Sequence, residues 1–113
     1  MSLKAAIDAL NSKAISTDTN GTILINSNDD LDDYIEGGVY RCQSSSVASS
    51  LSNCPITTGF RLIVMRTGYT TDSYSIQIIL CASGVAYPRI YVRARSADSW
   101  SPQWYILNQT AVS

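Results

Sequence analysis

The sequence predicts an α+β fold that is mostly β: an antiparallel sheet meander with short helical turns, preceded by a short, coiled-coil-like N-terminal helix. Tyr, Ser, Thr, Val and Ile are frequent, and this composition favours strands. Four strand-like runs follow Pro55, whereas the first 14 residues have helical periodicity. With 113 residues, 45% apolar and 15% charged, the chain suits one globular domain with a short appendage.

The N-terminal segment carries an apolar stripe in which Leu3, Ile7, Leu10 and Ala14 follow at steps of four, three and four. This spacing is that of the apolar seam of a heptad repeat. A helix of this length is only marginally stable alone in water, so its stripe must pack against another surface. That surface is either the chain's own domain or copies of the helix around a symmetry axis. We favour self-association, because the sequence predicts no partner helix.

A hairpin is predicted at Asn20-Gly21, because both residues tolerate positive φ. Its flanking segments are Ile15–Asp18 and Thr22–Ile25. We therefore expect residues 1–28 to form an N-terminal helix and a stalk or oligomerisation arm, and residues 29–113 to form the β domain.

The β domain is expected to begin with a capped helical turn at residues 29–34, in which an Asp side chain accepts free N–H groups. Leu31 and Tyr34, three residues apart, share one face of this turn. A strand is expected at Val39–Gln43. The polar stretch 44–53 predicts a loop with one loose helical turn, because its two apolar residues are four apart.

The second half of the chain predicts a meander, because short connections favour antiparallel pairing. The predicted strands are Phe60–Arg66, Tyr74–Cys81, Ala86–Arg95 and Gln103–Leu107. In the third of them, alternation predicts that Ile90, Val92 and Ala94 face inward, with arginines and a tyrosine on the other side.

Charge is unevenly distributed along the chain. Residues 1–40 hold seven acidic residues against two lysines, whereas residues 41–113 hold six arginines against two aspartates. The basic part can face an anionic polymer or the acidic segment of a neighbouring chain, and a mixed solvated surface is the third interpretation. A pI near 5.0 and the presence of only two lysines argue against a nucleic-acid partner.

The arginine-rich side of the third run is the candidate ligand surface. Guanidinium groups bind phosphate or carboxylate, and Tyr and Trp offer flat apolar faces with a polar edge that suit sugars. The alternative is that the arginine stems cover the sheet or pair with acids across a subunit boundary. We take as candidate ligand-binding residues Arg89, Tyr91, Arg93, Arg95, Tyr69 and Trp100.

Catalysis, metals and cofactors are not expected. The chain has no His, no nucleophile elbow and no phosphate-binding glycine loop, so the common catalytic arrangements are excluded. After residue 40 only Asp72 and Asp98 remain as carboxylates, and the acidic cluster Asp29–Glu36 lacks calcium-loop spacing. The three cysteines have no metal spacing, and we expect free thiols, with a Cys42–Cys54 bridge as the alternative. No apolar run is long enough to cross a membrane.

Several segments in order resemble the pyocin-knob domain of tail fibres and baseplate proteins of phages, prophages and phage-derived bacteriocins. The resemblance covers roughly two thirds of the chain. It rests on Asp30–Tyr34, Gly38–Tyr40, Leu51–Pro55, Ser75–Leu80, Ile90–Arg93, Trp100, Trp104 and Leu107. The patterning of Leu31, Tyr34, Val39 and the two tryptophans places them in a core, with Trp104 the stronger core candidate.

The resemblance implies a compact knob, commonly trimeric, that is carried on a fibrous stalk and contributes to adsorption on a bacterial surface. It supplies no catalytic residues. We therefore expect a homotrimer in a virion tail, made in the host cytoplasm, that binds other tail or baseplate proteins and a surface glycan or teichoic-type polymer, with no membrane insertion. The alternative is a purely structural tail component that links or caps other tail proteins.

Overall fold

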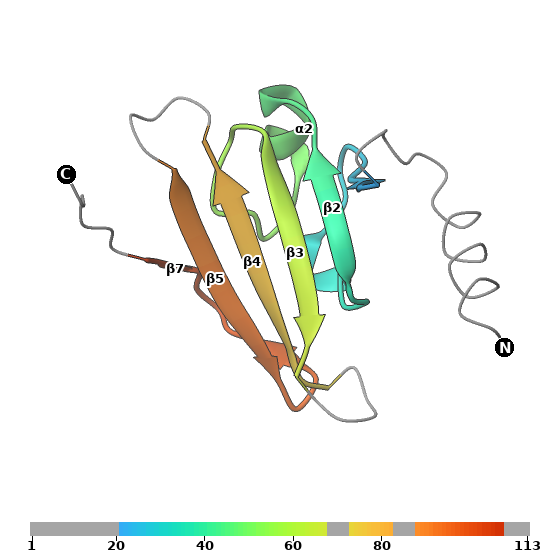
Figure 1. The fold of residues 1–113 in the computed structure, drawn as a ribbon, viewed down its shortest axis with the longest axis vertical. Coiled ribbons are helices and arrows are strands. Elements are labelled where there is room, and N and C mark those ends of the chain that lie inside the picture. The colour runs from blue at the N-terminus through green and yellow to red at the C-terminus, as the bar shows by residue number, and fades with distance from the viewer. Residues whose placement is uncertain (1–20, 68–72, 83–87, 108–113) are drawn as a thin grey trace, which may run out of the picture.

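The computed structural model describes residues 21–67, 73–82 and 88–107, and within these ranges it contains one seven-stranded sheet (Figure 1). The strands are β1 (Ile23–Leu24), β2 (Gly38–Cys42), β3 (Phe60–Arg66), β4 (Ser75–Cys81), β5 (Arg89–Ser96), β6 (Ser99–Trp100) and β7 (Tyr105–Ile106). The predicted N-terminal helix, with Leu3, Ile7, Leu10 and Ala14, and also Tyr69, lie outside the described residues.

Strands β2 to β5 form an antiparallel meander in which each strand pairs with the next, so the mostly β fold is confirmed. β6 and β7 both pair antiparallel with β5. At the opposite edge β1 pairs parallel with β2, with Ile23 opposite Tyr40. Ile25, just after β1, is 1% exposed. The sheet and core therefore extend N-terminal to residue 29, where the domain boundary was expected.

Both predicted helical turns are present, and both begin with a side-chain cap. The 3-10 helix η1 (Leu31–Asp33) follows Asp30, whose carboxylate accepts the backbone N–H two residues on at 2.9 Å. Helix α2 (Ser45–Ser50) follows Ser44, whose hydroxyl accepts the backbone N–H three residues on at 3.2 Å. Each cap satisfies an N–H group that has no partner inside the helix.

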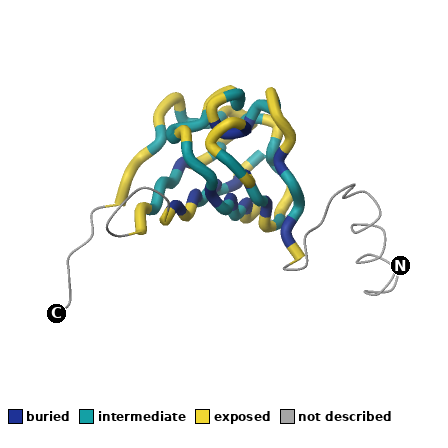
Figure 2. Tube along the Cα trace, turned by 90° about the horizontal axis from the view of Figure 1, so that it is seen from above, coloured by how far each residue is buried: buried dark blue, intermediate teal, exposed yellow. Residues whose placement is uncertain are grey.

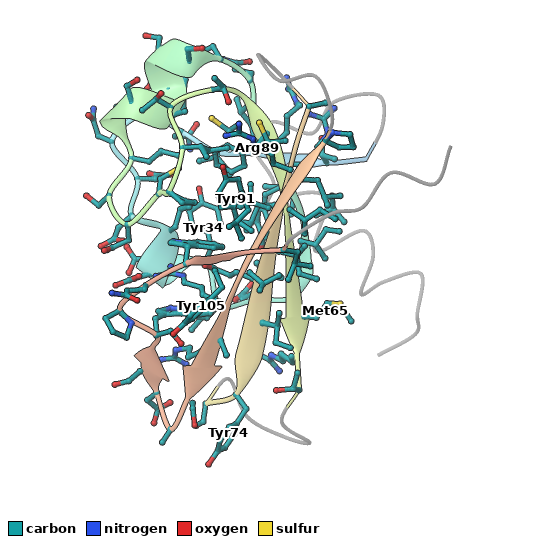
Figure 3. The ribbon with its side chains drawn as sticks, turned by 90° about the vertical axis from the view of Figure 1, so that its left-hand side faces the viewer. Tyr34, Met65, Tyr74, Arg89, Tyr91 and Tyr105 are labelled. Carbon is teal, nitrogen blue, oxygen red and sulfur yellow. The ribbon has the colours of Figure 1, made fainter. Side chains whose placement is uncertain are left out.

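The described loops and helical turns cover one face of the sheet, the covered face, and leave the other, the open face, uncovered by any described segment (Figure 2). The core lies under this cover, where Leu31, Leu62 and Ile79 are each 0% exposed. Figure 3 shows Tyr91 on the covered side and Met65 on the other. Alternation along β2–β5 gives the open face Val39, Arg41, Arg61, Ile63, Met65, Ile76, Ile78, Leu80, Ile90, Val92 and Ala94.

The expected orientation of β5 is wrong. Ile90 and Val92 are only half-buried and Ala94 is exposed, whereas Arg93 is 5% exposed under the cover. The alternation in the sequence correctly divides the strand into two faces. It does not say which face is covered, because the cover comes from segments far away in the chain.

The three cysteines carry free thiols, as expected. Cys42 and Cys81 are buried and Cys54 is half-buried. Burial raises the pKa of the Cys42 and Cys54 thiols above the ordinary value, so both side chains stay neutral near neutral pH. The cysteines therefore act as small apolar residues in this fold.

A tight turn of two residues joins β5 to β6, with Ser96 paired to Ser99 on either side of it. Ala97 has φ 50° and Asp98 has φ 68°, as a type I′ turn requires. In both residues Cβ crowds the following carbonyl, but the polar side chain of Asp can offset the cost by local hydrogen bonding, whereas that of Ala cannot.

We predict that Ala97→Gly stabilises the protein by about 1 kcal/mol, because glycine adopts positive φ without the Cβ clash. The free energy of unfolding in urea measures the effect. Ala94→Gly, two residues before the end of β5, is the matched control and should instead destabilise. A loss of stability in Ala97→Gly equal to that in Ala94→Gly would contradict the strain described here.

Candidate functional site

The site is built around Arg93, in the middle of β5 on the covered face. Its side chain is 3% exposed, and its Nη1 lies 2.8 Å from Oδ1 of Asp32. Its Nε donates to Oε1 of Gln77 on the neighbouring strand at 2.8 Å. Its Cζ lies 4.5 Å from the ring centroid of Trp100 and 4.6 Å from that of Trp104. A buried cation is therefore balanced by one carboxylate, one amide and two aromatic faces.

Gln77 extends this arrangement to the segment that covers the sheet. It is 0% exposed, although most residues of its strand are apolar. Its amide Nε2 donates to the carbonyl oxygen of Leu31 at 2.7 Å and to that of Tyr34 at 3.0 Å. These carbonyls flank η1, so β4 holds the helical turn that presents Asp32 to Arg93. Both atoms of the amide group are thus satisfied in a buried position.

The two indoles attach the C-terminal part of the chain to the same cover. Trp100 Nε1 donates to the carbonyl oxygen of Asp32 at 2.9 Å, and Trp104 Nε1 donates to that of Asn53 at 2.9 Å. The Asn53 side chain in turn donates to the Asp30 carboxylate at 2.8 Å. Each tryptophan therefore contacts Arg93 with its ring face and a loop carbonyl with its edge.

The electrostatics follow from this geometry. Burial lowers the pKa of Arg93 below its ordinary value, and the nearby Asp32 opposes this shift. Hydrogen bonds from Asn53 and from the backbone N–H of Asp32 hold the pKa of Asp30 below its usual range. The Nη2 of Arg93 is buried without a hydrogen-bond partner among the described residues. The guanidinium thus depends on its contacts with Asp32, Gln77 and the two indoles.

A polar cavity of about 370 Å³ lies beside this arginine, next to the β5–β6 turn. The Asp98 carboxylate at its rim accepts a hydrogen bond from the Ser73 hydroxyl at 2.9 Å and lies 3.6 Å from Nη1 of Arg95. The lining residues are Asp32, Asn53, Arg93, Arg95, Asp98, Ser99, Trp100, Ser101 and Pro102. Cavities of this size accommodate small ligands such as a sugar unit.

The structure brings together three of the six candidate ligand residues, Arg93, Arg95 and Trp100, at this cavity. Arg89 is exposed at the opposite end of β5, and Tyr91 is half-buried against the core. Arg93 is enclosed by the fold, so the surface available to a ligand is supplied by its neighbours. Trp104 packs against the core, as expected.

Sequence reasoning missed the lining contributed by Asn53, Asp98 and Ser99, and it missed Gln77. A glutamine in the middle of an apolar strand is a signal for a buried hydrogen-bonding role. Asn53 comes from a distant loop, and no pattern in the sequence places it beside β5. Within the described ranges, no cluster of potential metal ligands is present, and no helix is long and apolar enough to span a membrane.

We predict that Arg93→Lys destabilises the protein by about 2–3 kcal/mol, because an ammonium group cannot contact Gln77, Asp32 and the indoles together. Urea unfolding measures the loss. Arg95→Lys on the same strand is the matched control. Its ion pair with the exposed Asp98 is worth less than about 1 kcal/mol. Equal losses in the two variants would show that Arg93 has no special structural role.

Comparison with known proteins identifies the fold. No family model matches the chain, and no curated protein sequence matches it. Two solved structures are similar. A C-terminal fragment of the Pseudomonas aeruginosa R1 pyocin fibre superposes with a TM-score of 0.64 at 22% identity, covering 76% of this chain and 21% of that one. An N-truncated R2-type pyocin tail fibre gives 0.64 at 21% identity, covering 76% and 32%.

The match extends over three quarters of this chain but a third or less of either fibre fragment. The sequence similarity is low, so the comparison speaks for the fold. It agrees with the resemblance carried by the segments from Asp30 to Leu107. The described part of this chain therefore has the fold of a pyocin tail-fibre segment, which confirms its resemblance to pyocin-knob domains.

Proposed function

We propose that the protein is a homotrimeric tail-fibre or baseplate module of a phage or phage-tail-like particle, and that it binds the bacterial cell surface without catalysis. The observation that carries this proposal is the fold shared with segments of two pyocin fibres. Because the chain spans only part of those fibres, its own place in a particle, at the virion tail, belongs to the proposal.

The polar cavity beside Arg93 is the proposed ligand site. Arg95 and Asp98 supply a donor and an acceptor at its rim, and Ser99 and Ser101 add hydroxyl groups. The Trp100 ring is held in place by its contact with Arg93 and by its hydrogen bond to the loop. A rigid aromatic face surrounded by donors and acceptors suits a glycan or an anionic wall polymer.

A purely structural role is the second candidate, and the position of Arg93 favours it. Arg93, at the centre of the candidate ligand surface, is enclosed by the fold and contacts Asp32 and Gln77 of the same chain. In this alternative the arginines hold the knob together, and its surface contacts other tail proteins. The two roles differ in whether the isolated protein binds bacterial surfaces.

The experiment measures binding of the labelled full chain to intact Gram-negative and Gram-positive cells, and to purified lipopolysaccharide and teichoic acid. We expect Arg95→Ala to weaken binding about tenfold or more, because it removes a charge-assisted hydrogen bond at the cavity. Arg89→Ala is the matched control on the same strand and should change affinity less than about twofold, because Arg89 lies outside the cavity.

Loss of binding in Arg89→Ala alone would move the site to the other end of β5. Unchanged binding in both variants would show that neither Arg89 nor Arg95 belongs to the ligand site. A protein that ignores all four targets but binds an isolated tail protein would support the structural role. Arg93→Ala is unsuitable for this test, because it leaves Asp32 without its partner and disturbs the fold.

A further inference from the structure

The open face of the sheet is apolar from one side to the other. Strand register places one residue from each of β2, β3, β4 and β5 in a continuous row: Val39, Ile63, Ile78 and Val92. Met65, Ile76 and Ala94 form a parallel row on one side of it. On the other side, Leu80 and Ile90 continue a row that begins with the two arginines. The face carries no carboxylate on these four strands.

This face is more apolar than a sheet surface in water normally is. An antiparallel sheet with one solvated side usually carries polar residues there. Here the polar residues Gln77, Arg93 and Arg95 are on the covered side. Val39 is 42% exposed, Met65 53% and Leu80 40%. Such a distribution is expected when the exposed side of the sheet becomes a second buried layer in an assembly.

The area of the face matches what association requires. With roughly 150–200 Å² for each large apolar residue, the exposed fractions amount to on the order of 500 Å². Three such faces meeting in the homotrimer remove on the order of 1,500 Å² of apolar surface from water, which lies within the range of total area buried in specific interfaces. This area counts the apolar residues alone, and the aliphatic stems of the arginines at the rim add further buried surface.

The composition of the face indicates another copy of the same chain. Obligate contacts between identical subunits are the most apolar class of protein interface. A surface that is apolar over most of its area can pack against an identical surface. Both of its charges, Arg41 and Arg61, occupy neighbouring positions at one end of the face, where an interface rim tolerates them.

We propose that the open face of β2–β5 is the surface through which copies of this chain pack against one another. This inference deepens the proposed homotrimer by naming the contact that forms it. It differs from association through the N-terminal heptad stripe, because the interface lies in the knob itself. The sheet then separates two apolar layers, one within the chain and one between chains.

The test uses light scattering to measure the mass of the full chain and of two single variants, Met65→Glu and Leu80→Glu. Both side chains are exposed in one chain, so the monomer tolerates the changes. A packed apolar interface does not tolerate a buried charge. We expect an oligomer for the unchanged protein and a fall to the 12.3 kDa monomer mass for each variant. Ser49→Glu, at an exposed position of α2 on the covered side, adds the same charge and should leave the mass unchanged.

Circular dichroism of each variant checks that the sheet remains folded, and having two independent variants guards against the failure of one. An unchanged protein that is monomeric would overturn the proposal, and so would an oligomer that survives both variants. The first result would leave the open face to the N-terminal segment or another protein, and the second would assign association to another surface. Neither result bears on binding to bacterial surfaces, which is measured separately.

Discussion

The buried guanidinium of Arg93 is the interaction on which the rest of this structure depends. A charge removed from water is tolerated only when nearby groups compensate for the lost hydration. Asp32, Gln77 and two indole rings do so here, and each comes from a different part of the chain. One side chain therefore joins the helical turn, the neighbouring strand and the C-terminal tryptophans, and Trp104 in turn bonds the loop at Asn53.

The same arrangement joins the acidic early part of the sequence to the arginine-rich later part. The acidic turn at residues 29–33 covers the sheet, and the basic strand β5 lies beneath it in the same chain. The ion pair between Arg93 and Asp32 joins the two. The cavity beside Arg93 inherits its rigidity from these contacts, which suits a site that does not rearrange on binding.

Local structure was predictable from the sequence, because its causes are local. The caps at Asp30 and Ser44, the strands β2 to β5 and their meander all follow from neighbouring residues. The parallel pairing of β1 and the short strand β6 were not predicted, since neither has a distinctive pattern. The orientation of β5 was predicted wrongly, because apolar residues were assumed to face the chain's own core.

The candidate site was only half predictable for a related reason. Arg95 was identified from the alternation of its strand, and Trp100 from its aromatic side chain. Asn53 reaches the cavity from a loop more than 40 residues away from either of them. The role of Arg93 could not be predicted, because an arginine on a strand has the same pattern whether it meets solvent or a pair of tryptophans.

The hydrogen bonds of the two indoles also determine when the chain can finish folding. Trp100 bonds a residue 68 positions earlier and Trp104 a residue 51 positions earlier. Contacts over such separations form slowly, because a long loop must close before they contribute any stability. On the ribosome, Asp32 and Gln77 emerge before Arg93, whereas its contacts with the two indoles must wait until Trp104 has emerged. The described fold therefore reaches its final packing only after synthesis has passed Trp104.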